Sequence, residues 1–177
     1  LRKQAEEALA IEQERSEKLL LNVLPQAIAD QLKQSLDLLQ ERTSKALIAE
    51  SYDEVTVLFA DIVSFTNLSA NVSAADLVGL LNRIFLVFDD LCEKHGIEKI
   101  KTIGDAYLAV GGLPNPRPDH AEAIANMALD IQQEITQFRT YEGHAIAVRV
   151  GINTGSVIAG VIGKKKFTYD LWGDTVN

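Results

Sequence analysis

All 11 glycines of this 177-residue chain lie after residue 50, and this asymmetry divides the sequence into two unlike parts. Residues 1–50 contain a single proline, Pro25, and are rich in alanine, leucine, glutamate, glutamine and lysine. This composition favours long helices, because glycine and proline are the residues that most destabilise a helix interior. Residues 51–177 instead predict strands, turns and helices in one domain of ordinary length. We therefore expect a helical arm over 1–50 and a folded domain over 51–177.

The helical arm carries the spacing of a coiled coil, although the pattern is imperfect. The spacing alternates between four and three residues, as is typical of a two-stranded coiled coil. The seam consists of Leu1, Ala5, Ala8, Glu12, Arg15 and Leu19. Glu12 and Arg15 fall on this seam and weaken it, so a solvated single helix is the alternative. Pro25 kinks or restarts the helix. Because the chain begins inside a helical pattern without a cap or a Met, we expect it to be part of a longer protein.

Charge and cysteine content exclude several classes of function. The net charge is −8 at pH 7, which argues against a nucleic-acid partner, since such binding needs a basic surface. A single cysteine, Cys92, allows neither an intrachain disulfide nor a cysteine-based zinc site, and fits a reducing, cytoplasmic compartment. No apolar run approaches the roughly 18 residues of a spanning helix, although the parent protein could be membrane-anchored or linked to a sensor. The three histidines share no ligand spacing, so we expect them on the surface or in loops.

After Ser51 the pattern predicts an α+β domain of the ferredoxin-like kind, with the order β-α-α-β-β-α-β-β. Ser73 and Asp76 form a capping box that begins a helix, and Gly96 ends it. Gly104 and Asp105 form the turn of a hairpin between two apolar runs. The predicted elements are strand 55–60, a helix after the turn at Asp61, the helix from Ser73 to Gly96, strands 97–103 and 106–110, a helix capped by Asp119, a strand region divided into 145–152 and 154–162, and strand 167–171.

Two aspartates stand where a sheet could bring them together. Asp61 ends the apolar strand 55–60, and Asp105 sits at the tip of the hairpin. If their strands are neighbours, both carboxylates reach one edge of the sheet, where they repel unless a cation lies between them. Oxygen ligands suit a hard divalent ion, Mg²⁺ or Mn²⁺. The alternatives are that Asp61 caps a helix beginning at Ile62 and that Asp105 only forms the turn.

Two further features could serve a phosphate ligand. Residues from Ile62 to Thr66 follow Asp61 at a strand-to-helix turn, where backbone N–H groups suit phosphate. Lys101 lies four residues before Asp105 inside an apolar strand. It either needs an anionic partner or is a lysine of an edge strand that faces water.

Four motifs in order resemble those of the class III nucleotidyl cyclases. Phe59–Thr66 resembles their first metal motif and Glu98–Tyr107 their second; Gly151–Gly155 and Tyr169–Asn177 resemble the later strand and the substrate motif. Leu20–Ala29 resembles the helical linker that precedes the cyclase domain in membrane and sensor cyclases. The resemblance covers most of residues 19–177.

The resemblance implies an adenylate cyclase, a lyase that converts ATP to 3′,5′-cyclic AMP and pyrophosphate. Asp61 and Asp105, assisted by the Ile62 carbonyl, would hold two Mg²⁺ or Mn²⁺ ions, which lower the pKa of the ribose 3′-hydroxyl and hold the phosphates. The hydroxyl would then attack the α-phosphate in line. Phe65 and Thr66 would belong to the substrate-binding turn that follows Asp61.

Base choice and assembly are implied in the same way. Lys101 and Asp170 match the positions that read the base: lysine donates to adenine N1, and aspartate accepts from the 6-amino group. Guanine presents the reverse pattern, and in the guanylyl cyclases of this family the matching positions are glutamate and cysteine. Asn177 matches the residue that orients the ribose. In a head-to-tail homodimer one subunit would give Asp61 and Asp105, and the other would give Lys101, Asp170 and Asn177.

Other readings stay open at this point. A guanylate or dual-specificity cyclase shares the motifs, and a palm-like polymerase or cyclic-dinucleotide synthase shares the acid pair but leaves Tyr169–Asn177 unexplained. A non-catalytic, nucleotide-binding dimerisation fragment is a further alternative, because the family's transition-state arginine would fall four residues beyond Asn177. By the same resemblance the arm over 1–50 would be a signalling helix that links an upstream sensor or membrane domain to the catalytic domain.

Overall fold

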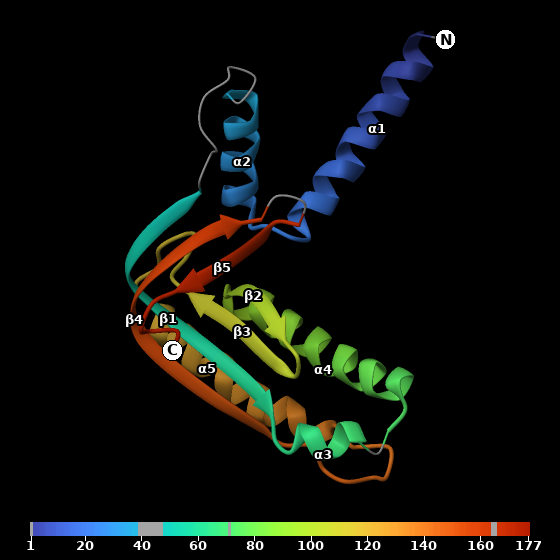
Figure 1. The fold of residues 1–177 in the computed structure, drawn as a ribbon, viewed down its shortest axis with the longest axis vertical. Coiled ribbons are helices and arrows are strands. Elements are labelled where there is room, and N and C mark those ends of the chain that lie inside the picture. The colour runs from blue at the N-terminus through green and yellow to red at the C-terminus, as the bar shows by residue number, and fades with distance from the viewer. Residues whose placement is uncertain (1, 39–47, 71, 164–165) are drawn as a thin grey trace. The chain divides into compact units, whose positions relative to one another are not determined.

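The computed structural model describes residues 2–38, 48–70, 72–163 and 166–177 (Figure 1). The parts of the predicted arm at Leu1 and 39–47, and the side chains of 2–8 and 35–38, lie outside this description. In chain order the elements are α1 (Arg2–Leu21), α2 (Gln26–Leu38), β1 (Ala49–Ile62), α3 (Phe65–Ala70), α4 (Ala74–His95), β2 (Glu98–Ile103), β3 (Ala106–Gly111), α5 (His120–Glu134), the 3₁₀ helix η1 (Ile135–Gln137), β4 (Val148–Ile162) and β5 (Thr168–Trp172).

The described residues form two compact units. One unit consists of the residues up to Glu50 together with Ala159–Asp170, and the other consists of Ser51–Ile158 together with Leu171–Asn177. The strands follow the order β2-β3-β1-β4-β5. None of the described helices combines the length and the apolarity that a bilayer crossing requires. The functional division at residue 50 into a signalling helix and a catalytic domain stays a prediction.

In the first unit, Pro25 separates two helices. α1 ends at Leu21 and α2 begins at Gln26, because a proline has no N–H group to continue a helix. The Pro25 carbonyl accepts hydrogen bonds from the N–H groups of Ile28 and Ala29 at 3.0 and 2.9 Å. The proline therefore starts α2, and the prediction that it restarts the helix is confirmed.

The described seam residues Glu12, Arg15 and Leu19 all lie on the exposed surface of α1, Leu19 with 63% of its surface accessible. Leu9 and Ile11, which are not seam positions, are exposed as well. Such apolar positions on one chain are compatible with a second helix. The coiled coil stays a prediction.

In the second unit, the local signals of the sequence form the predicted turns and caps. The Ser73 Oγ accepts a hydrogen bond from the Asp76 N–H at 3.2 Å, as in a capping box. Gly96 ends α4 in the left-handed conformation, with φ 63°. Gly104, with φ 62°, begins the two-residue turn that joins β2 to β3. These three predictions are confirmed.

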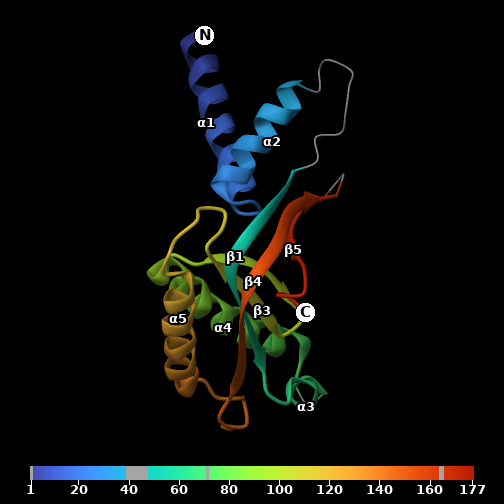
Figure 2. The same ribbon diagram turned by 90° about the vertical axis from the view of Figure 1, so that its left-hand side faces the viewer.

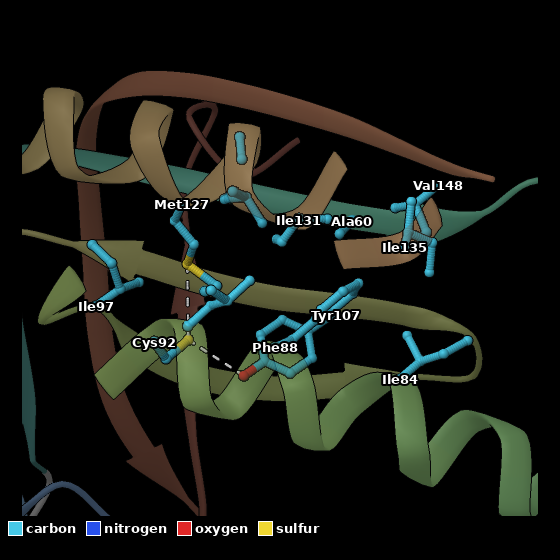
Figure 3. Close-up of a cluster of buried hydrophobic side chains, with 14 of the residues drawn as sticks. Ala60, Ile84, Phe88, Cys92, Ile97, Tyr107, Met127, Ile131, Ile135 and Val148 are labelled. Carbon is cyan, nitrogen blue, oxygen red and sulfur yellow. Dashed lines mark hydrogen bonds between the residues drawn. The ribbon is translucent and has the colours of Figure 1, made fainter. Parts of the chain in front are cut away.

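Helices α4 and α5 cover one face of the β1–β3 part of the sheet (Figures 1 and 2). Figure 3 shows the core between them, where the Phe88 and Tyr107 rings meet edge-on with centroids 5.4 Å apart. Cys92 is buried in this core, and its Sγ lies 3.3 Å from the Tyr107 hydroxyl. Because side chains alternate between the two faces of a strand, the strand residues at odd positions of β1, including Asp61, lie on the face opposite to the helices.

The division of residues 145–162 into two strands is wrong, because β4 runs without a break from Val148 to Ile162. Gly155 and Gly160 have no positive φ and form no turn. A Cβ at Gly155 would lie 2.6 Å from the Thr175 Oγ1, and a Cβ at Gly160 would lie 2.6 Å from the Ile48 carbonyl oxygen. These glycines therefore allow a close approach of neighbouring chain within an uninterrupted strand.

The start of α5 also departs from the prediction. The Asp119 carboxylate does not cap the helix but accepts hydrogen bonds from Arg117 at 2.7 and 2.6 Å. His120 was expected on the surface, yet only 7% of it is exposed. Its Nδ1 lies 2.8 Å from the Thr56 Oγ1, which in turn lies 2.8 Å from the Thr154 Oγ1. The Thr56 hydroxyl thus provides a hydrogen-bond partner for the buried ring.

Candidate functional site

The register of β1 and β3 brings the two predicted metal ligands together. The strands are antiparallel neighbours, and Asp61 lies opposite Ala106. Asp105 directly precedes Ala106 in the hairpin turn, so its carboxyl group reaches that of Asp61, and the two share a hydrogen bond. The alternative that Asp61 caps a helix beginning at Ile62 is wrong, because Ile62 still belongs to β1. Asp105 does lie in the turn between β2 and β3, and its side chain also contacts Asp61.

The pKa values of the two carboxyl groups are shifted in opposite directions. The hydrogen bond from Asp105 lowers the pKa of Asp61, and the adjacent guanidinium of Arg149 lowers it further. Burial raises the pKa of Asp105, and so do the hydrogen bond and the negative charge of Asp61. Two carboxylates this close cannot both ionise at low cost. The pKa of Asp61 is thus held below its ordinary value, and that of Asp105 above it.

Arg149 on β4 is the residue that sequence reasoning missed. Its guanidinium makes an ion pair with the Asp61 carboxylate, although 71% of the arginine side chain is exposed. The signal that could have found it is a lone charge between Val148 and Val150 in an apolar strand. The guanidinium beside Asp61 offsets part of the repulsion between the two acidic side chains.

The donor set fits a hard divalent ion. The carboxylates of Asp61 and Asp105 and the carbonyl of Ile62 are all oxygen donors, which Mg²⁺ and Mn²⁺ prefer. Among the residues that the structure describes, His, Cys, Asp and Glu side chains form no cluster of three or more suited to a metal. A magnesium ion commonly keeps water and substrate phosphates as its other ligands, so two protein carboxylates are sufficient.

The turn after Asp61 is ordered by contacts with the chain before β4. Ile62 is buried, and the Val63 N–H donates to the Ala147 carbonyl at 2.9 Å. This N–H group was expected to face phosphate and is instead engaged in the protein. Phe65, half-buried, and Thr66, exposed, open the six-residue helix α3 directly after the turn.

Lys101 lies on the same face of the sheet as Asp61. It pairs with Leu108 across β2 and β3, and Leu108 pairs with Phe59 across β3 and β1. Directly paired residues project to the same face, and Phe59 precedes Asp61 by two residues. A register shift between Lys99 and Lys101 sets this alignment. The half-buried lysine thus stands on the face opposite to α4 and α5.

The two remaining predicted residues lie in different units. Asp170, half-buried on β5, belongs to the unit that contains the residues up to Glu50. Asn177 belongs to the other unit, where it is exposed. There it lines a cavity of about 240 Å³ together with Val57, Phe59, Asn153 and other residues of β4 and the chain end.

The family model of the adenylate and guanylate cyclase catalytic domain matches residues 47–177. The chain belongs to this family of cyclase catalytic domains. An adenylate cyclase of Mycobacterium tuberculosis is 46% identical over 173 residues, which make up 98% of this chain and 37% of that protein. The guanylate cyclase soluble subunit beta-2 of Rattus norvegicus is 41% identical over 170 residues, 96% of this chain and 24% of that protein.

A solved cyclase structure supports the same assignment. The catalytic core of a rhodopsin-guanylyl cyclase with converted specificity, in complex with ATPαS, superposes with a TM-score of 0.70 at 46% identity. The match covers 73% of this chain and 70% of that one. The predicted α+β cyclase fold is thereby confirmed. The cyclase chain described here spans little more than a third of the mycobacterial relative, 37% of its length.

Proposed function

We propose that this cyclase domain converts ATP to 3′,5′-cyclic AMP and pyrophosphate. The observation that carries the proposal is the hydrogen-bonded pair of Asp61 and Asp105 at the end of β1 and the hairpin turn. Asp61, Asp105 and the Ile62 carbonyl would hold two Mg²⁺ or Mn²⁺ ions. When bound, such ions acidify a hydroxyl nucleophile and neutralise phosphate charge.

The protein's own residues supply binding and orientation. Lys101 projects from the sheet face that also carries Asp61, and its ammonium would donate to adenine N1. Asp170 would accept from the 6-amino group, and Asn177 would orient the ribose from its cavity. Phe65 and Thr66 would line the substrate beside the metal ligands.

Base choice is the point on which the relatives differ. Both an adenylate cyclase and a guanylate cyclase subunit match this chain over nearly its whole length, at 46% and 41% identity. ATP is favoured here because Lys101 and Asp170 offer a donor and an acceptor, whereas guanine requires the reverse. The residues proposed to read the base therefore distinguish the adenylate reaction from the guanylate or dual-specificity alternative.

Assembly and context complete the proposal. Asp61 with Asp105, and Lys101 with Asp170 and Asn177, would come from different subunits of a head-to-tail homodimer, so that each site is shared. The arm over 1–50 would act as the signalling helix of a longer protein with an upstream sensor or membrane domain. A nucleotide-binding dimerisation fragment without turnover is the alternative that a product assay excludes.

The test compares kcat/KM for ATP and GTP in the full-length protein and in the double variant Lys101→Glu, Asp170→Cys. Each unpaired buried polar group costs about 1–3 kcal/mol. Two such groups amount to roughly 2–6 kcal/mol, which is on the order of 30- to 10⁴-fold preference for ATP. The double variant should lose ATP turnover and raise its relative use of GTP.

A charge reversal away from the site is the matched control. Lys94→Glu replaces an exposed lysine of α4 that pairs with Asp130 at 2.7 Å, and it should leave the ratio of ATP to GTP use unchanged. An ATP/GTP ratio in the double variant equal to that of the wild type would show that Lys101 and Asp170 do not read the base. Absence of cyclic nucleotide from either substrate in the wild type would favour the non-catalytic alternative.

A further inference from the structure

The last five residues, Gly173–Asn177, form a turn that is fastened to β4. We call this segment the C-terminal turn. The Val176 N–H donates to the Gly173 carbonyl at 3.0 Å and closes it. The Thr175 Oγ1 donates to the Ser156 carbonyl at 2.6 Å, and the Asn153 Nδ2 donates to the Thr175 carbonyl at 3.2 Å. Two side chains therefore bridge the C-terminal turn and the middle of β4.

The orientation of Asn153 is fixed by a second hydrogen bond. Its Oδ1 accepts from the Thr154 N–H at 3.0 Å, so the Nδ2 has to face the Thr175 carbonyl. An aspartate at this position would place a carboxylate oxygen against that carbonyl and lose the donor. The amide is thus suited to both of its partners at once.

Gly155 provides the space that this fastening needs. A Cβ at this position would lie 2.6 Å from the Thr175 Oγ1, a distance that real Cβ atoms do not show. Because Thr175 has a short, branched side chain that is already bonded to Ser156, it cannot move aside without breaking that bond. The backbone of β4 and the hydroxyl of Thr175 therefore meet only when residue 155 is glycine.

The C-terminal turn sets where Asn177 lies. Asn177 is the last residue of the turn and lines the 240 Å³ cavity with Val57 and Phe59. Val57 and Phe59 belong to β1, so the cavity lies between this strand, β4 and the C-terminal turn. Asn177 is exposed, and Asn153, Thr175 and Val176 line the same cavity. The position of the Asn177 side chain therefore depends on the fastening of the residues before it.

We propose that Asn153, Gly155 and Thr175 are positioning residues that hold Asn177 in place for the reaction. This inference rests on the proposed function, in which Asn177 orients the ribose of the substrate. Such positioning acts on the rate, because a misplacement of about 1 Å at a group that orients the reacting atoms costs on the order of 10²-fold. Loosening the turn should therefore lower kcat more than it raises KM.

The test uses three substitutions in the full-length protein. Thr175→Val removes the hydroxyl and keeps the shape, and it should lower kcat about 10-fold with KM changed less than about 3-fold. Thr175→Ser keeps the hydroxyl and should restore most of that loss. Thr136→Val is the matched control, because the Thr136 Oγ1 also donates to a backbone carbonyl, that of Gln133, at 2.6 Å. It should leave both constants unchanged.

Two double variants separate positioning from general destabilisation. In Asn177→Ala the residue to be positioned is gone, so adding Thr175→Val should cause little further loss. Adding Thr175→Ala to Gly155→Ala removes the hydroxyl that the new Cβ would meet. The kcat of this double variant should therefore be no lower than that of Gly155→Ala alone. Additive losses in both pairs would overturn the proposal, because residues that act through one another are not additive.

Amide hydrogen exchange keeps this inference separate from the proposed function. Thr175→Val, unlike Thr136→Val, should raise the exchange rate of peptides covering residues 172–177. If the wild type makes no cyclic nucleotide but the exchange rate rises, the proposed function fails while the fastening stands. If the exchange rate of these peptides does not change in Thr175→Val, the positioning inference fails whatever the activity.

Discussion

Replacing Glu98 by glutamine should stabilise the protein at pH 8 and leave its stability at pH 4 unchanged. Glu98 opens β2 opposite the buried Val110 and lines a cavity of about 450 Å³ with Asp89, Glu93 and Lys99. Lys99 is engaged with Asp89 at 2.7 Å. Burial therefore raises the pKa of Glu98 from 4.5 to about 7. The side chain is half-buried in an environment that disfavours its charge.

The direction in which stability changes with pH follows from the number of protons that the folded and unfolded states bind. Between the unfolded pKa of 4.5 and the folded pKa of about 7, the folded state holds a proton that the unfolded state lacks. Stability therefore falls as the pH rises through this window, and the full cost is present above pH 7. The shift corresponds to an upper limit of about 3 kcal/mol. Partial exposure and solvent screening reduce this to roughly 1–2 kcal/mol.

Urea unfolding of the wild type and Glu98→Gln at pH 4, 5, 6, 7 and 8 measures the difference in the free energy of unfolding. The other carboxyl groups titrate in both proteins and cancel in this difference. Glu93→Gln, an exposed neighbour on the same cavity, controls for the removal of one negative charge. A difference between wild type and Glu98→Gln that does not grow between pH 5 and pH 8 would refute the reasoning.

Three further predictions concern the proposed reaction and its regulation. Asp105→Asn should leave the fold intact and lower turnover by several orders of magnitude, because divalent ions supply several kcal/mol of catalysis; near-wild-type turnover of a folded variant, checked by circular dichroism, would contradict the metal assignment. Subunits with Asp61→Ala and subunits with Asn177→Ala should complement each other when mixed, since one intact shared site remains; activity no higher than either parent, in a mixture shown by mass spectrometry to contain heterodimers, would refute shared sites. Glu12→Leu with Arg15→Leu should lock one helix register and reduce the regulatory range of the full-length protein; an unchanged range, measured as the ratio of turnover with and without the input signal, would leave the arm as a tether.

Local signals in the sequence determined the parts of the fold that depend on neighbours along the chain. Ser73 and Gly96 bounded α4, Gly104 turned the hairpin, and Pro25 began α2, because caps and turns are formed within a few residues. The acid pair was predicted on the condition that β1 and the hairpin are neighbours, and the pairing of β1 with β3 meets that condition. The motif resemblance identified the cyclase family from residues alone, and the family match bears it out.

Only the tertiary structure decided the contacts between segments that are distant in sequence. Residues 49–54 of β1 are mostly exposed and have no apolar alternation, yet they form part of the strand. Arg149 pairs with Asp61 from a strand that lies 88 residues away, and Thr56 provides a hydrogen-bond partner for the buried His120 across 64 residues. Gly155 and Gly160 of β4 are positions of close approach, with Thr175 and Ile48 respectively. A sequence pattern records which side chain is present, whereas its partner is set by strand pairing and by the space that the rest of the chain leaves.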